Sequence, residues 1–194
     1  MPESACFSEA ELRGLGLKDF GERVHLSRKA SLYGASSIAL GSDVRIDDFC
    51  VLSSGAGGIR VGSHVHIAVH CSLIGRGAIE LGDFSNFSSR VSIYSSNDDY
   101  SGAKMTNPMV PEEYTGVQHA PVSVGRHVIV GAGSVILPGA VLEEGVAVGA
   151  LSLVRGRCEA FGIYAGIPAR RLKERKRDLL ELEARMRAGR RGKP

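Results

Sequence analysis

A repeat with a period of six residues dominates the second half of this sequence. From residue 124 to residue 154 an aliphatic residue stands at every sixth position: Val124, Val130, Ile136, Leu142, Val148 and Val154. A small or β-branched residue follows four places later: Val128, Ser134, Ala140, Val146 and Ser152. This period is neither that of an amphipathic helix nor the alternation of a half-buried strand. Repeats of this kind predict a solenoid, in which each turn buries its core against its neighbours.

The hexads predict a triangular coil, in which every hexad supplies a short flat strand and a corner. The aliphatic residue then points into the prism, and the small residue four places later faces inward near the corner. Glycine suits tight corners because it adopts positive φ without steric cost, and the chain has 25 glycines. Successive coils pair as parallel strands about 4.8 Å apart. We therefore expect an all-β chain that forms a parallel β-helix.

The same phase extends toward the N-terminus. Leu26 and Leu32 begin a first coil, and further coils follow at Leu40, Ile46 and Leu52, at Val61, Ile67 and Leu73, and at Leu81, Phe87 and Ile93. One long interruption, the loop 94–123, is polar and contains proline and glycine, which argues against a helix. Loops of this length in compact folds are usually functional. The loop is therefore where we expect the chemistry.

The two ends of the chain carry helix signals. Ser8 and Glu11 fit a capping box, which predicts a short N-terminal helix that ends near Gly14 or Gly16 and covers the first coil. The segment 171–187 predicts a C-terminal amphipathic helix that packs on a coil side or on a neighbouring subunit, with apolar residues Leu172, Leu179, Leu182 and Met186. The basic end, 188–194, is expected to fray.

These signals divide the chain into an N-terminal cap, 1–23, a β-helix domain, 24–170, and a C-terminal helix with its tail, 171–194. The formal net charge of +3 is too small to argue for a nucleic-acid partner. No signal peptide or membrane span is visible, because glycine and proline break the apolar runs. We expect a cytoplasmic protein that binds neither nucleic acid nor membrane, with binding of either by the basic tail as the alternative.

The repeat, together with the closing Ala165-Gly166-Ile167-Pro168-Ala169-Arg170, resembles the left-handed β-helix acyltransferases, the hexapeptide-repeat family. Within it, the chain is most similar to the carbohydrate O- and N-acetyltransferases of the galactoside, maltose and xenobiotic type. The resemblance implies a homotrimer that uses acetyl-CoA as co-substrate and acts on a small sugar or sugar nucleotide. The active cleft is then shared by the loop of one subunit and the coils of the next.

Cysteine and histidine positions favour structural and cleft roles over a metal site. Cys50 and Cys71 are each the fourth residue after a hexad aliphatic, so we expect them to stack as buried, reduced thiols. His64 is expected to stack between Asp43 and Phe84, and His70 to lie between Phe49 and Arg90. The spacing of His64, His66 and His70 does not match the γ-class carbonic anhydrases, which share this coil, so no metal is predicted. A cleft-lining role for His66 or His70 is the alternative to plain surface positions.

The resemblance places a catalytic histidine one short step beyond the strand at residues 91–94, where this sequence has Asp98. Two hypotheses follow: Asp98, supported by Asp99, serves the acceptor, or His119 at the far end of the loop is the base. A carboxylate with a pKa of about 4 is a poor base for a sugar hydroxyl, whereas an amine with a pKa of about 8 is already partly the free nucleophile at neutral pH. The residues therefore favour an amine acceptor. The alternative is that residues 97–99 form only a solvated turn.

By the same resemblance, acetyl-CoA lies along the later coils, at Ala132, Ala150, Arg155, Arg170 and Lys173. The two alanines would leave room for pantetheine to reach the backbone, although corner sterics alone also explain them. The basic residues would pair with CoA phosphates. Acceptor contacts are expected from His66, His70, Arg90, Tyr94 and Asn97.

The sequence thus predicts an acetyl-CoA-dependent acetyltransferase that modifies an amino group of a sugar, such as a nucleotide-linked deoxyamino sugar destined for surface polysaccharide. The first alternative is a sugar O-acetyltransferase with His119 as base. The second is a β-helix that does not acetylate, either a metal hydratase or a structural trimer.

Overall fold

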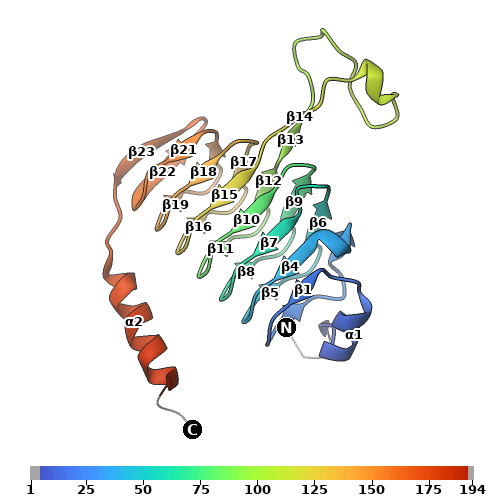
Figure 1. Cartoon of the computed structure of the whole chain (residues 1–194). Coiled ribbons are helices and arrows are strands. Elements are labelled where there is room, and N and C mark those ends of the chain that lie inside the picture. The colour runs from blue at the N-terminus through green and yellow to red at the C-terminus, as the bar shows by residue number, and fades with distance from the viewer. Residues whose placement is uncertain (1–4, 192–194) are drawn as a thin grey trace.

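The hexad repeat folds into a three-sided parallel β-helix, whose stacked coils are shown in Figure 1. This computed structural model describes residues 5–191. Residues 1–4 and 192–194, including the end of the tail expected to fray, lie outside the described part. The three faces are parallel sheets, apart from one antiparallel pair at the C-terminal end of the second.

Successive coils contribute strands to the three faces in turn, and the last coil has none on face 3. Face 1 contains β1 (Asp19–Phe20), β4 (Ile38–Leu40), β7 (Ile59–Val61), β10 (Ile79–Leu81), β15 (Val122–Val124), β18 (Val141–Leu142) and β21 (Arg157–Cys158). Face 2 contains β2 (His25–Leu26), β5 (Arg45–Ile46), β8 (His66–Ile67), β11 (Asn86–Phe87), β16 (Ile129–Val130), β19 (Ala147–Val148), β22 (Gly162–Gly166) and β23 (Ala169–Glu174). Face 3 contains β3 (Ser31–Tyr33), β6 (Val51–Ser54), β9 (Ser72–Gly75), β12 (Ser92–Tyr94), β17 (Val135–Ile136) and β20 (Leu153–Val154).

The predicted inward residues form the core. Phe87, Ile93, Val130 and Ile136 are fully buried, and every other hexad aliphatic except the half-buried Leu32 is buried. The small or β-branched residues of the 124–154 repeat are buried as well, and so are the thiols Cys50 and Cys71. Stacking like residues coil upon coil keeps this narrow core continuous. The prediction of a parallel β-helix is therefore confirmed, and so is the prediction of which rows of residues face inward.

Aromatic and imidazole rings stack along the corner between faces 1 and 2. The ring of His64 lies 4.6 Å from that of Phe84, and His64 Nδ1 lies 3.4 Å from Asp43 Oδ2, as predicted. His127 continues the stack at 5.0 Å from Phe84. At the next corner the ring of His70 stacks 5.0 Å from that of Phe49, also as predicted.

The N-terminal cap has the predicted helix. Helix α1 (Glu9–Gly14) begins with the Ser8–Glu11 capping box and buries Leu12. The coil itself begins earlier than expected, because β1 already pairs with β4 on face 1.

The C-terminal segment differs from the prediction at its start. Residues 169–174 form β23, which pairs antiparallel with β22, so the helix expected from Arg171 begins only at Asp178. β23 supplies hydrogen-bond partners to β22, the last coil strand of face 2. Without β23, that sheet edge would leave backbone N–H and C=O groups unpaired. Helix α2 (Asp178–Arg191) then lies along the corner between faces 1 and 2, where Glu183 meets His127 and Arg187 lies over the Phe84 ring.

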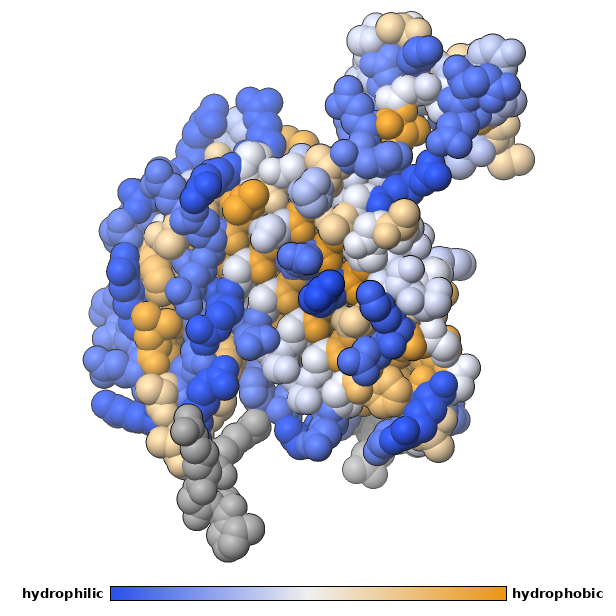
Figure 2. All heavy atoms as spheres, viewed as in Figure 1, coloured by the Kyte–Doolittle hydropathy of each residue, from blue (hydrophilic) through white to orange (hydrophobic). Residues whose placement is uncertain are grey.

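The long loop leaves the coil as an arm between β12 and β15 (Figure 1). Its base is a short antiparallel ladder of β13 (Ser96–Asn97) and β14 (Gln118–His119). A short 3-10 helix, Glu112–Tyr114, lies within the arm, and another, Ala35–Ser37, precedes β4. Figure 2 shows polar residues over most of the arm. Several large apolar side chains on it are nevertheless exposed, including Tyr100 and Met109. Among the described residues, no helix is long and apolar enough to cross a membrane.

Candidate active site

The base of the arm holds the predicted residue His119 against Ser96, a residue that the sequence analysis did not single out. Ser96 pairs with His119 in the β13–β14 ladder, and Ser96 Oγ lies 2.8 Å from His119 Nδ1. Ser96 Oγ also accepts the backbone N–H of Arg76 at 2.8 Å. His119 is therefore held against the coil although it lies at the far end of a long loop.

A hollow of about 530 Å³ opens beside this ladder. It is lined by Asp98 and His119, by Arg76 of the coil, and by the arm residues Glu112 and Val117. Arg76 Nη1 lies 2.8 Å from Glu112 Oε1 and ties the outer arm to the coil. The two candidate bases thus share one hollow with a cation at its edge.

Asp98 and Asp99 have different surroundings. Asp99 accepts hydrogen bonds from the N–H and hydroxyl of Ser101 and from the N–H of Lys104, at 2.9 to 3.0 Å. The Ser101 bonds hold the pKa of Asp99 below its ordinary value of 3.8. Asp98 is exposed, and within residues 5–191 no hydrogen bond or ion pair engages its carboxylate. Asp99 shapes the arm, whereas Asp98 is free to meet a ligand.

The residues expected to contact CoA are partly brought together. Ala132 and Ala150 are exposed and lie one above the other at the corner between faces 2 and 3, where Leu151 N donates to Ala132 O at 2.9 Å. Arg170 pairs with Ala165 on the next coil, and Lys173 pairs with Ile163. Arg155 follows β20, so face 3 separates it from the two alanines. The structure thus places four of the five on one side of the coil.

The predicted acceptor residues are spread over the coil. His66 lies on the outside of face 2, while His70 and Arg90 occupy successive positions of the corner between faces 2 and 3. Tyr94 is half-buried at the end of β12, and Asn97 is exposed in the arm ladder. Face 3 therefore lies between the histidines and the arm of the same chain.

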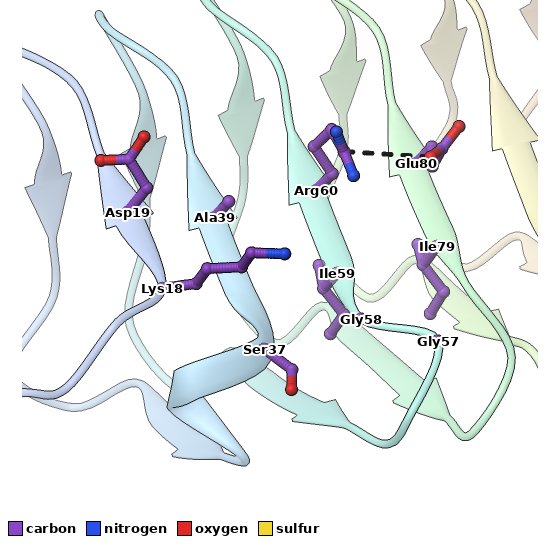
Figure 3. A pocket seen from close by; sticks show the side chains of 10 residues that line it. All are labelled: Lys18, Asp19, Ser37, Ala39, Gly57, Gly58, Ile59, Arg60, Ile79 and Glu80. Carbon is purple, nitrogen blue, oxygen red and sulfur yellow. Dashed lines mark ion pairs between the residues drawn. The ribbon is translucent and has the colours of Figure 1, made fainter.

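A second, smaller hollow of about 210 Å³ lies on face 1 (Figure 3). Lys18 reaches from the start of β1 across β4, and Arg60 Nε lies 3.9 Å from Glu80 Oε1. Asp19 completes a set of two cations and two carboxylates around a floor that includes Ala39. None of the site residues predicted from sequence lines it. Within residues 5–191, no group of three or more His, Cys, Asp or Glu side chains is arranged to hold a metal ion.

The fold and the comparisons with known proteins indicate the same class of protein. The chain is 52% identical over 180 residues to dTDP-4-amino-4,6-dideoxy-D-glucose acyltransferase of Escherichia coli, covering 93% of this chain and 94% of that protein. It belongs to the left-handed β-helix, hexapeptide-repeat acyltransferases. No family model matches the chain.

Solved structures support this assignment. AntD, an N-acyltransferase from Bacillus cereus, superposes with a TM-score of 0.91 at 41% identity, covering 95% of this chain and 98% of that one. Its solved complexes hold coenzyme A with dTDP or with dTDP-4-amino-4,6-dideoxyglucose, in variants with one aspartate or one serine replaced. A more distant relative from Escherichia coli K12, named for O-acetyl transfer in lipopolysaccharide biosynthesis, is 30% identical over 119 residues, which cover 60% of this chain and 57% of that protein.

Sequence reasoning missed several residues of this region. Ser96 and Arg76 position His119 and the arm, yet neither stands out, because their partners lie across a long-range contact. Asp47 and Asn86 also escaped notice, although both engage the predicted residue His66. Both residues stand at outward hexad positions next to a buried aliphatic or aromatic residue. Such a position by itself predicts only a surface side chain.

Proposed function

We propose that this protein transfers an acetyl group from acetyl-CoA to the 4-amino group of dTDP-4-amino-4,6-dideoxy-D-glucose or a closely related nucleotide-linked sugar. The relative with 52% identity carries this acceptor in its name, and AntD binds it together with coenzyme A. The observation in this chain that carries the proposal is the unengaged Asp98 carboxylate in the hollow at the base of the arm.

The chemistry suits an amine. The free amine attacks the thioester carbonyl carbon, the C–S bond breaks, and CoA leaves as the thiolate while the nitrogen loses a proton. Asp98 would attract the ammonium form of the acceptor and receive the proton directly or through water. Backbone N–H groups near the arm would stabilise the oxyanion of the tetrahedral intermediate. Asp99 acts through the arm, whose turn it closes.

We further propose that the site is shared by neighbouring subunits of a homotrimer. The serine and the aspartate replaced in AntD are ten residues apart, and Ser88 and Asp98 have the same spacing here. Ser89 and Asp99 are also ten residues apart, but the Asp99 carboxylate is hydrogen-bonded within its own turn. We therefore match the AntD pair to Ser88 and Asp98. Ser88 follows β11 and Asp98 follows β13, so face 3, roughly 15 Å wide, separates them within one chain. Two copies of the chain bring such residues to one substrate.

The exposed apolar residues of the arm support this assembly. Tyr100 is 87% exposed and Met109 is 90% exposed, although large apolar side chains normally find cover. A neighbouring coil would bury them and place Asp98 beside that coil's corner with Ser88, Ala132 and Ala150. His70 and Arg90 of the same corner would then reach the acceptor.

The O-acetylation alternative rests on His119. Ser96 Oγ accepts a hydrogen bond from the Arg76 N–H, so the Ser96 hydroxyl can donate its hydrogen to an unprotonated Nδ1 of His119. In that tautomer the imidazole carries its proton on Nε2 and donates a hydrogen bond instead of accepting a proton. This arrangement supports a role for His119 in orienting the acceptor, with Asp98 as the group that meets the amine.

An acyl-CoA is the co-substrate, and acetyl is our proposal for its acyl group; AntD also binds 3-hydroxybutyryl-CoA. We propose a cytoplasmic reaction, because both substrates are charged nucleotides. The polysaccharide destination rests on the lipopolysaccharide-biosynthesis relative.

A thioester-release assay tests the proposed function. Acetyl-CoA and 3-hydroxybutyryl-CoA would each be incubated with dTDP-4-amino-4,6-dideoxyglucose, with the 4-hydroxy analogue dTDP-6-deoxyglucose, and with free sugars. We expect CoA release with the amino sugar nucleotide and little with the others. Faster release with the hydroxyl analogue would establish the O-acetylation alternative.

A further inference from the structure

The outside of face 2 carries a chain of polar side chains that the proposed mechanism does not use. Arg45 Nε donates to Asp47 Oδ1 at 2.7 Å, His66 Nε2 lies 2.9 Å from Asp47 Oδ2, and His66 Nδ1 lies 3.1 Å from Asn86 Oδ1. These four residues, called the face-2 strip below, come from three successive coils. Strand register aligns them, because Arg45 pairs with His66 and His66 pairs with Asn86.

Asp47 is the fixed point of the strip. It is only 6% exposed, although it lies on the outside of a solenoid face, and both carboxylate oxygens are occupied. Burial raises the pKa of Asp47, but the hydrogen bonds from Arg45 and His66 outweigh burial and hold the pKa below its ordinary value of 3.8. The carboxylate is therefore ionised at neutral pH and orients both neighbours.

The outward ends of the strip remain available. The side chains of Arg45 and His66 are 48% and 40% exposed. Within residues 5–191 the Arg45 side chain is bonded only through Nε, which leaves its two terminal nitrogens with unused donors. A guanidinium held in this way presents a fork that matches a phosphate. An imidazole and an amide fixed beside it suit sugar hydroxyls.

The strip also leads to Ser88, which the proposed assembly places beside Asp98 of a neighbouring subunit. Ser88 follows β11 directly and lies two residues after Asn86, so the two side chains are about 7 Å apart along the extended chain. Asp47, Ala68 and Ser88 follow one another in register on successive coils, which puts Asp47 about 10 Å from Ser88. On the other side of Ser88 lies Gly131, next to the proposed CoA position Ala132.

We propose that the face-2 strip is the binding site for the sugar-diphosphate part of the acceptor. His66 and Asn86 hydrogen-bond to the sugar next to Ser88, Arg45 binds the diphosphate farther along the coil, and Asp47 is the positioning residue that holds Arg45 and His66. This inference rests on the proposed function, because it assumes a nucleotide-linked acceptor. Donor and acceptor then approach Ser88 along the same side of the coil from opposite ends.

The hollow on face 1 is the competing location. Lys18 and Arg60 offer two cations there, but Asp19 and Glu80 balance their charge, and Arg60 is already near Glu80. It also lies on a different face from Ser88. A dianionic ligand is therefore better served by Arg45, whose partner Asp47 is shielded beneath it.

Calorimetric titration of the full-length protein with dTDP tests the inference. Arg45→Ala should weaken dTDP binding at least tenfold, whereas the matched control Arg60→Ala on face 1 should bind as the unaltered protein does. Unchanged dTDP binding by Arg45→Ala would overturn the inference. So would weaker binding by Arg60→Ala alone, which would place the diphosphate in the face-1 hollow.

Kinetics separate the remaining roles. Asn86→Ala and His66→Ala should raise KM for the amino sugar nucleotide tenfold or more, with dTDP binding nearly unchanged. Asp47→Asn should raise KM and weaken dTDP binding together, with kcat and Tm close to those of the unaltered protein. A fall in Tm with unchanged KM would make Asp47 merely structural and would contradict its positioning role.

The experiments distinguish a wrong assignment of the face-2 strip from a wrong proposed function. If the unaltered protein acylates the amino sugar nucleotide but the strip variants keep its KM, the strip is wrong and the function stands. If the unaltered protein acylates no nucleotide-linked amino sugar, the proposed function fails first.

Discussion

Ser96 Oγ and His119 Nδ1 lie 2.8 Å apart across the base of the arm. This contact closes the arm onto the coil and sets His119 beside Asp98 in one hollow. The two residues are thereby candidates for the same task, and substitution separates them.

Asp98→Asn should lower kcat/KM for the amino sugar about tenfold to a hundredfold, because a neutral amide neither attracts an ammonium nor accepts its proton. His119→Ala should cost less than Asp98→Asn, since we assign His119 an orienting role. Initial rates of CoA release at saturating acetyl-CoA measure both. Unchanged turnover in Asp98→Asn would remove that residue from the mechanism, and a larger loss in His119→Ala would make His119 the base.

The attachment of α2 should depend on one carboxylate. Glu183 lies 2.6 Å from His127 Nε2 and 2.6 Å from Arg187 Nε, and it also meets Arg126. Glu183→Gln should weaken docking by about 1–3 kcal/mol, because the hydrogen bonds lose their charge. Hydrogen exchange of the α2 amides measures this. Glu181→Gln is the control, since Glu181 is 79% exposed on the same helix; equal exchange in both variants would contradict the assignment.

The contacts of Glu183 also predict that the docking of α2 depends on pH. Burial alone would raise the pKa of Glu183, but hydrogen bonds from Arg187 and His127 bring it below its ordinary value of 4.5. A carboxylate with a lowered folded pKa stabilises the folded state above its unfolded pKa and loses that contribution as pH falls through the folded pKa. Exchange of α2 should therefore be slow at pH 7 and accelerate relative to the coil below about pH 4.5. Acceleration that is identical in Glu183→Gln would assign the effect to another group.

The four cysteines should be protected in the folded protein. Cys50 and Cys71 are fully buried, Cys158 is 4% exposed and Cys6 is 7% exposed. Contact with Cys71 and burial raise the pKa of Cys50, and burial raises that of Cys158 to about 11. A thiol reagent at pH 8 should react slowly with the native protein and promptly with four thiols after denaturation. Prompt reaction at Cys50 or Cys71 in the native state would contradict their place in the core.

Gly131, at the corner proposed to bind CoA, should resist substitution. A Cβ on Gly131 would lie 2.4 Å from the backbone N of Ala150, so the coils there would have to separate. Gly131→Ala should cost about 1–3 kcal/mol of unfolding free energy, as overpacking does, and weaken CoA binding. Gly14→Ala is the control, because nothing lies within 4 Å of its Cβ position. Urea unfolding compares them, and equal stabilities would contradict the close coil approach.

Much of the coil could be predicted from sequence because its signal is local and repeated. The hexad rows and the His64–Phe84 stack follow from the phase of the repeat, and the capping box follows from the spacing of Ser8 and Glu11. The β23 strand could not be predicted, because its residues also fit a helical pattern and only the edge of β22 decides between them.

The candidate site was less predictable than the coil. Asp98 and His119 could be nominated, but their meeting depends on an antiparallel ladder that joins the two ends of a long loop. The Asp47–His66–Asn86 bonds depend on side-chain rotamers across three coils, which periodicity does not report.

The most direct measurement is the structure of the product formed from acetyl-CoA and dTDP-4-amino-4,6-dideoxyglucose. Our account predicts a nucleotide sugar that carries one acetyl group in an amide at the 4-nitrogen, which mass spectrometry detects and which survives mild alkaline hydroxylamine. An ester that hydroxylamine removes, or an amino sugar nucleotide recovered unchanged with acetyl-CoA intact, would contradict it.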